Sequence, residues 1–108
     1  MANRWAGEVA LVVDGERRVM KLTLGALAEL EEALETGTLV ELAERFEAGR
    51  FSARDVLALI LAGLRGGGWT GSAAALRRAE IEGGPVAAAR AAGQLLVRAF
   101  ELPGDGSA

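Results

Sequence analysis

The chain has 108 residues and a formal net charge of −3, and 51% of its residues are hydrophobic although only 5% are aromatic. This length predicts one domain, and a core poor in aromatic residues predicts closely packed helices rich in Leu, Val and Ala. The absence of cysteine excludes disulfides and thiolate metal sites. The net acidity argues against general binding to a phosphate backbone.

Neither the N-terminal sequence nor any apolar run predicts export or membrane insertion. The start, MANRWAGEVA, lacks the basic region and apolar run of a secretory signal. The longest apolar run has nine residues, far fewer than the roughly 20 that span a bilayer. We therefore expect a cytoplasmic protein that makes no membrane contact.

A β-hairpin is predicted for EVALVVDGERRVMKLT, because two runs of alternating apolar residues flank Asp14 and Gly15, a strong turn signal. A two-residue loop would place Leu11 opposite Arg18, whereas a four-residue loop would place it opposite Met20. We favour the four-residue loop, since it sets apolar side chains opposite each other on one face. A lone hairpin is at best marginally stable in water, so this face is expected to lie on helices.

Three helices follow the hairpin, and each begins and ends at its own signal residues. Thr23 can cap the first helix, which Gly37 ends. Thr38 opens a capping box of the form T-x-x-E and starts the second helix, which runs to the next glycine. Ser52 starts the third helix in the same way, with Asp55 in the place of the glutamate.

The third helix contains VLALILAGL, residues 56–64, and is predicted to be the centre of a small helical bundle. Its large apolar residues cover an arc of roughly 200° at about 100° per residue, wider than the stripe of about 100° that a surface helix needs. Ile60 and Leu61 are expected to be almost fully buried, with Leu57 and Leu64 also in the core. The open side is expected to carry Arg54, Ala58, Ala62 and Arg65.

The triplet Gly66, Gly67 and Gly68 predicts a flexible turn, with Trp69 in the loop that follows. A short helix is expected from residue 72 to about residue 82. It is the weakest predicted element, because its only large apolar residues do not share a face.

A last helix starts at Pro85, since proline is well tolerated at the first helical position. Residues 103–108 are polar and expected to be disordered, which leaves residues 1–102 as a single domain. These elements predict an α-dominated α+β fold, with an N-terminal β-hairpin packed on a small bundle of four to five short helices. The apolar side of the last helix is expected to hold Val86, Ala89, Ala92, Gly93, Leu96, Val97 and Phe100.

The sequence offers no catalytic or metal-binding constellation. It has no His, Cys or Tyr and a single lysine, Lys21, which leaves its serines without an obvious base. We therefore expect a protein that is not an enzyme and holds no metal or cofactor. The triple glycine does not match a phosphate-binding loop. The arginine pairs lack interleaved aromatic residues, so nucleic acid is not the expected partner.

Trp69 has two interpretations, an interface anchor on a glycine hinge or a lid packed on the central helix. Trp5 has the same two interpretations. If Trp69 is an anchor, a helical partner would bind between its loop and the open side of the central helix. The predicted partner-binding residues are Trp5, Arg65, Gly66, Gly67, Gly68 and Trp69.

Charge is divided along the chain. Residues 24–49 contain seven glutamates and one arginine, whereas residues 50–100 contain seven arginines and three acidic residues. The acidic helices of one copy are therefore expected to attract the arginine-bearing helices of another, which leaves self-association open.

The order of these features resembles the small tail protein of bacterial gene transfer agents, which are particles derived from prophages. That family is grouped with phage tail assembly chaperones and is also labelled a tail tube protein. The resemblance covers roughly residues 3–102. It is carried by the D-G hairpin, by LTLGALAELEEAL (22–34), by SARDVLALILAGLRGGGW (52–69) and by the amphipathic last helix.

The resemblance implies a non-enzymatic role in building a phage-like tail. Chaperones of this kind coat the long helical tape measure protein, which makes that protein or other tail proteins the expected partners. A structural component of the tail tube is the alternative, and it would be incorporated in a phage-like particle. We favour the chaperone, because a tube subunit is expected to be β-rich. A small regulatory helical domain that binds nucleic acid is the second alternative.

Overall fold

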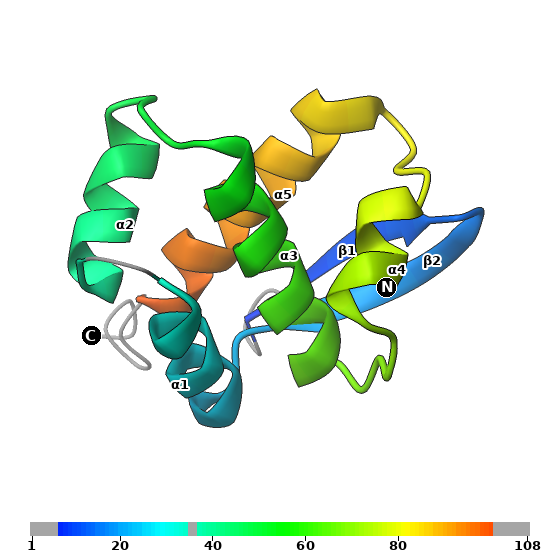
Figure 1. The fold of residues 1–108 in the computed structure, drawn as a ribbon, viewed down its shortest axis with the longest axis horizontal. Coiled ribbons are helices and arrows are strands. Elements are labelled where there is room, and N and C mark those ends of the chain that lie inside the picture. The colour runs from blue at the N-terminus through cyan, green and yellow to red at the C-terminus, as the bar shows by residue number, and fades with distance from the viewer. Residues whose placement is uncertain (1–6, 35–36, 101–108) are drawn as a thin grey trace, which may run out of the picture.

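A two-stranded hairpin and five helices make up the computed structural model of the chain, which describes residues 7–34 and 37–100 (Figure 1). This confirms the predicted α-dominated α+β fold. Trp5 and the predicted disordered tail, residues 103–108, lie outside the described residues. In chain order the elements are β1 (Glu8–Val13), β2 (Glu16–Lys21), α1 (Leu24–Ala33), α2 (Leu39–Glu47), α3 (Ala53–Gly66), α4 (Ala73–Arg78) and α5 (Gly84–Ala99).

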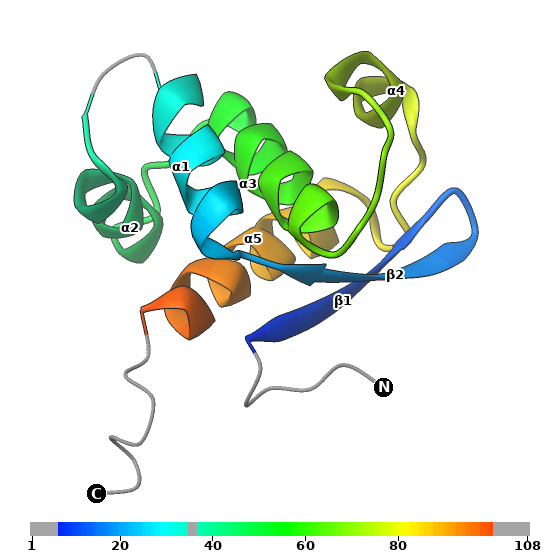
Figure 2. The same cartoon turned by 90° about the horizontal axis from the view of Figure 1, so that it is seen from below.

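Helix α3 lies at the centre, as predicted, and makes its most extensive contacts with β2, α1, α5 and α4. Seen from below, α5 and the hairpin form one layer, and α1, α3 and α4 form the other (Figure 2). The core lies between these layers. Its largest fully buried side chains are Met20, Leu30, Leu42, Leu59, Leu64 and Leu95.

The hairpin closes with a two-residue loop, so the favoured four-residue loop is wrong. Leu11 lies opposite Arg18 in the antiparallel pair. Asp14 and Gly15 have φ values of 51° and 79°, the left-handed conformation that a type I′ turn requires at both central positions. The twist of this turn matches that of the strands and outweighs the pairing of apolar side chains. The two registers share the same parity, so the apolar residues still face the helices.

Residues 80–82 cover the edge of β1 instead of extending α4, which ends at Arg78 rather than near residue 82. The N–H of Asp14 donates to the carbonyl oxygen of Glu80 at 2.7 Å, and the N–H of Glu82 donates to that of Val12 at 3.1 Å. The Asp14 carboxylate accepts from the N–H of Glu80 at 2.8 Å. Asp14 therefore both forms the turn and fastens a distant segment to it.

The predicted caps are confirmed at the second and third helices. Thr38 accepts from the N–H of Glu41 at 3.2 Å, and the Glu41 carboxylate accepts from the N–H of Thr38 at 3.0 Å. Ser52 and Asp55 make the same reciprocal pair at 3.1 and 2.9 Å. Each pair satisfies two backbone donors that the start of a helix leaves without a partner.

The predicted open side of α3 is partly wrong, since Arg54 and Arg65 are exposed but Ala62 is buried. Ile60 is buried as expected, but Leu61 and Leu57 are only partly buried, and Ala62 is 4% exposed. Helix α1 packs against α3. The exposed residues of α3 are Ala53, Arg54 and Arg65, and the partly buried Leu61 lies between the two arginines on the helix surface.

Candidate protein-binding groove

The triple glycine at the end of α3 makes a close contact with the hairpin. Gly66 belongs to the helix instead of the predicted turn, whereas Gly67 and Gly68 lie in a turn. A Cβ atom on Gly66 would lie 1.9 Å from the carbonyl oxygen of Lys21, and one on Gly67 would lie 2.0 Å from that of Val19. Only residues without a side chain let the helix end rest on the edge of β2. Gly68 has a φ of 100°, a conformation that also favours glycine.

Trp69 is partly buried against the core, and its ring packs beside Gly71. It lines a small cavity with Val19 of β2 and Leu64 of α3. This position agrees with the lid interpretation, while a role as an interface anchor stays a prediction. Arg65 is exposed on α3, with its guanidinium 3.7 Å from the Glu29 carboxylate of α1.

A long apolar groove runs between α2 and α5, on a part of the surface that the sequence did not predict as a site. Its volume is about 810 Å³. Five large hydrophobic residues are strongly exposed within the described ranges, and four of them line this groove. These four are Val40 (59% exposed), Val86 (66%), Val97 (62%) and Phe100 (47%). An exposed apolar cluster of this kind marks a surface that binds another molecule.

Helix α5 can form one wall of the groove because it has two apolar faces. The first is buried against the rest of the fold and consists of Ala88, Ala91, Ala92, Leu95 and Leu96. Ala92 and Leu96 were predicted on the core side, whereas the other three were not. The predicted core side is therefore partly wrong, since Val86, Val97 and Phe100 face solvent. The signal in the sequence is the alanine-rich first half of α5, where Ala88, Ala91 and Ala92 pack closely and leave Val86 on the other side.

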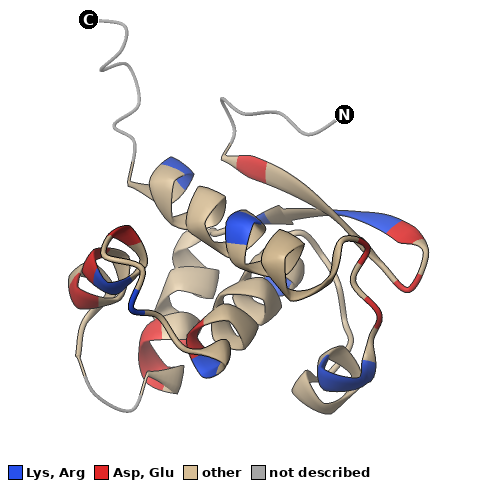
Figure 3. Cartoon of the chain, turned by 90° about the horizontal axis from the view of Figure 1, so that it is seen from above, with Lys and Arg blue, Asp and Glu red and all other residues tan. Residues whose placement is uncertain are grey.

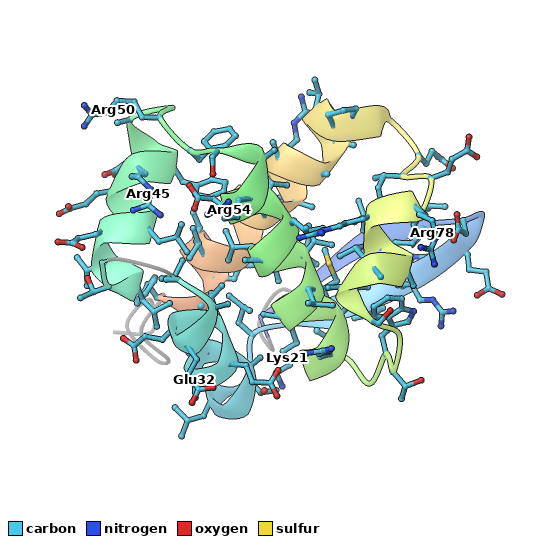
Figure 4. All side chains as sticks on the ribbon, viewed as in Figure 1. Lys21, Glu32, Arg45, Arg50, Arg54 and Arg78 are labelled. Carbon is cyan, nitrogen blue, oxygen red and sulfur yellow. The ribbon has the colours of Figure 1, made fainter. Side chains whose placement is uncertain are left out.

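The other wall is α2, which two aromatic rings and an ion pair hold in place. Phe46 of α2 stacks on Phe51 with ring centroids 4.4 Å apart. Arg45 donates to both carboxylate oxygens of Asp55 at the start of α3, at 3.2 and 3.0 Å. Figure 4 shows the Arg45 side chain between these two helices. Helix α2 is thus held in place by α3 as well as by α5.

Opposing effects act on the pKa of the Asp55 carboxylate. Partial burial acts to raise its pKa, but hydrogen bonds from Arg45 and Ser52 and the positive charge of Arg45 together lower the pKa below its ordinary value of 3.8. The carboxylate is therefore ionised at neutral pH. It serves two elements at once, as the capping partner of Ser52 and as the acceptor for Arg45.

The edges of the groove carry charges of opposite sign. Glu44 and Glu47 lie on the α2 side and Arg90 and Arg98 on the α5 side. Arg98 also donates to the backbone carbonyl oxygen of Glu8. In Figure 3 most charged positions of α2 are acidic, and those of α5 are basic.

Charged residues of both signs occur at both ends of the molecule, which is 41 Å in its longest dimension. Arg77 and Arg78 lie on α4, but acidic residues of the hairpin turn and of the segment after α4 lie at the same end (Figure 3). The division of charge along the sequence is therefore not a division between the two ends of the fold.

A second groove lies between α3, α4 and the start of α5, with a volume of about 530 Å³. Leu57, Ile60 and Leu76 contribute to it. It shares Phe51 and Ala89 with the first groove, so apolar surface continues from one to the other.

The described ranges contain neither a metal-binding cluster nor a membrane-spanning helix. Among residues 7–34 and 37–100, no group of three or more acidic, His or Cys side chains could hold a metal ion. No helix in the same ranges is both long and apolar enough to cross a bilayer.

The sequence profile of one family, described as phage tail tube protein, GTA-gp10, matches residues 6–102. The match covers nearly the whole chain and includes both walls of the groove. It agrees with the resemblance to tail proteins of gene transfer agents, and its wording supports the tube component better than the chaperone. Neither the curated proteins nor the solved structures gave a match to this chain.

Proposed function

The chain belongs to the GTA-gp10 family of phage tail tube proteins, and we propose that it works in a phage-like tail by binding other tail proteins through the α2–α5 groove. The observation that carries the proposal is the convergence of Val40, Val86, Val97 and Phe100 on one surface. Of the five strongly exposed large apolar residues in the described ranges, these four gather in one groove, and a gathered apolar surface of this kind is stabilised when a partner covers it.

The first candidate role is a component of the tail tube. The description of the family supports this role directly. The division of charge along the chain supports it as well, because the glutamates of α1 and α2 in one copy could meet the arginines of α4 in the next. Contacts of this head-to-tail kind generate rings or filaments.

The second candidate role is a chaperone that holds the tape measure protein before the tube forms. The groove favours this role, because two helices side by side leave a slot that an amphipathic helix can fill. The small amount of sheet favours it too. In the described ranges, the strands are the two six-residue ones of the hairpin, whereas a tube subunit is expected to be β-rich.

One experiment tests the proposal and separates the two roles. The protein is expressed with the neighbouring tail genes, and both finished particles and incomplete tail assemblies are analysed by quantitative mass spectrometry. A tube component is present in many copies in finished particles. A chaperone is bound to the tape measure protein in incomplete assemblies and is lost from finished particles. Absence from both fractions, with the protein folded, would overturn the proposal.

A further inference from the structure

We propose that the α2–α5 groove binds an amphipathic helix of a partner protein in one direction only, and that the opposite charges of its two edges set this direction. This inference rests on the proposed function, because it takes the same groove as the binding surface. It adds the chemistry of the partner: an apolar stripe with basic residues along one flank and acidic residues along the other.

The acidic edge consists of Glu44 and Glu47 on α2. They are three residues apart and therefore lie on neighbouring positions of one helix face. Both are exposed and line the groove. Within the described part of the chain, neither carboxylate has an ion-pair partner. Both are thus available to basic residues of a bound helix.

The basic edge consists of Arg90 and Arg98 on α5. Arg90 is exposed, and in the same described part it has no acidic partner. Arg98 is held at the groove by its bond to the Glu8 carbonyl oxygen, which leaves its charge without a carboxylate in the described ranges. Gly93 lies between these arginines, and a Cβ there would have only Phe46 within contact distance, at 3.9 Å. The absence of a side chain at the middle of α5 lets a partner helix approach its backbone.

A bound helix can place opposite charges against both edges of the groove in only one direction. Its apolar stripe must face the groove, so its two flanks lie along α2 and α5. Turning the helix end to end exchanges these flanks, which would place basic residues on Arg90 and acidic residues on Glu44 and Glu47. Contacts between like charges disfavour that arrangement, and charged edges of this kind fix orientation in other interfaces.

The partner is a different protein rather than a second copy of this chain. Helix α5 has an exposed apolar stripe with arginines but no acidic residue, and α1 has glutamates but no basic residue. The charged residues of α4 are Arg77 and Arg78. Helix α2 contains a single arginine, Arg45, which is already paired with Asp55. None of these helices offers a stripe with both kinds of flank.

The test uses three synthetic helical peptides that share one apolar stripe. The first has Lys on one flank and Glu on the other, the second has Lys on both flanks, and the third has Glu on both. We expect the mixed peptide to bind at least about threefold more tightly than either of the others at low salt. In the double variant Glu44→Arg with Glu47→Arg, both edges are basic, and the peptide with Glu on both flanks should bind best.

Direction is measured with a nitroxide label at the N-terminus of the mixed peptide. The methyl groups of Val86 and Val97 lie eleven residues apart on α5, which is roughly 16 Å along a helix. The label should broaden the NMR signals of one of these valines and not of the other. Exchanging the two flanks of the peptide should move the broadening to the other valine.

The control is the double variant Glu31→Arg with Glu32→Arg, which makes the same charge change on exposed positions of α1 outside the groove. Its peptide preference should equal that of the wild type. Equal affinities for the three peptides, or broadening of both valines, would refute the inference. If no peptide binds but tail proteins still co-purify through the groove, the inference fails and the proposed function stands. A wild-type dimer that Val86→Asp dissociates, without peptide binding, would assign the groove to a second copy and would also refute it.

Discussion

Replacing Gly66 with alanine tests whether the glycines at the end of α3 are a packing contact. The new Cβ would lie 1.9 Å from the Lys21 carbonyl oxygen and 3.1 Å from its carbonyl carbon. Carbon and oxygen normally approach to about 3.3 to 3.6 Å. The end of α3 and the edge of β2 must therefore separate by more than about 1 Å, because both atoms of Lys21 belong to the backbone and no side chain can move aside.

The expected loss of stability is about 1 to 3 kcal/mol, which is the usual cost of forcing extra atoms into a packed site. The higher helix propensity of alanine acts in the opposite direction, by at most about 1 kcal/mol and by less at the last residue of a helix. The packing cost is the larger effect, since separation of the two elements also loosens the burial of Leu64 at the same end of α3.

Urea denaturation followed by circular dichroism measures the difference, which should appear as a lower midpoint with an unchanged slope. The control is Gly25→Ala in the first turn of α1, where the nearest atom to the new Cβ is the Thr23 hydroxyl at 4.0 Å. This variant should be as stable as the wild type or slightly more stable. A Gly66→Ala variant at least as stable as the wild type would show that the glycines form a free turn.

Three further predictions concern the core, the caps and the response to pH. Leu59→Ala should lower the free energy of unfolding by about 2 to 5 kcal/mol, whereas Leu61→Ala should cost less because Leu61 is only partly buried; equal losses in urea titrations would contradict this. Thr38→Ala should cost about 1 kcal/mol through the lost cap, and a change below the error of the same titration would show that the cap contributes nothing. The lowered pKa of Asp55 stabilises the fold above the ordinary value of 3.8, and this contribution is lost as the pH falls through the folded pKa. The stability difference between the wild type and Asp55→Asn should therefore shrink below about pH 4, and a difference that grows on acidification would contradict the sign.

The elements that the sequence predicts correctly depend on local signals. Thr38 and Ser52 form their capping boxes with residues three positions away, and the turn depends on the backbone conformation of its own two residues, Asp14 and Gly15. Such interactions involve neighbours along the chain, so the order of residues contains nearly all the information that they need. The hairpin register was mispredicted because two local signals disagreed, and turn geometry outweighed the pairing of side chains.

The features that were missed depend on contacts between distant segments. The role of Gly66 and Gly67 becomes visible only when the carbonyl groups of β2 lie beside them. The groove was missed because α5 has an alanine face and a valine face, and only the packing of α3 and β1 decides which one is buried. The predicted binding site around Trp69 therefore fell on a different surface from the groove.

The central claim, that the α2–α5 groove binds other tail proteins, is tested most directly by one pair of variants. Val86→Asp and Leu24→Asp both replace an exposed apolar residue in the first turn of a helix, where an acidic side chain suits the helix dipole. Only Val86 lines the groove. Each variant is co-expressed with the neighbouring tail proteins and purified by an affinity tag. The account predicts that Val86→Asp, still folded, loses at least about 80% of the co-purified tail protein, as expected for about 1 kcal/mol or more of lost binding energy, while Leu24→Asp keeps it. Equal recovery with both variants would contradict the account.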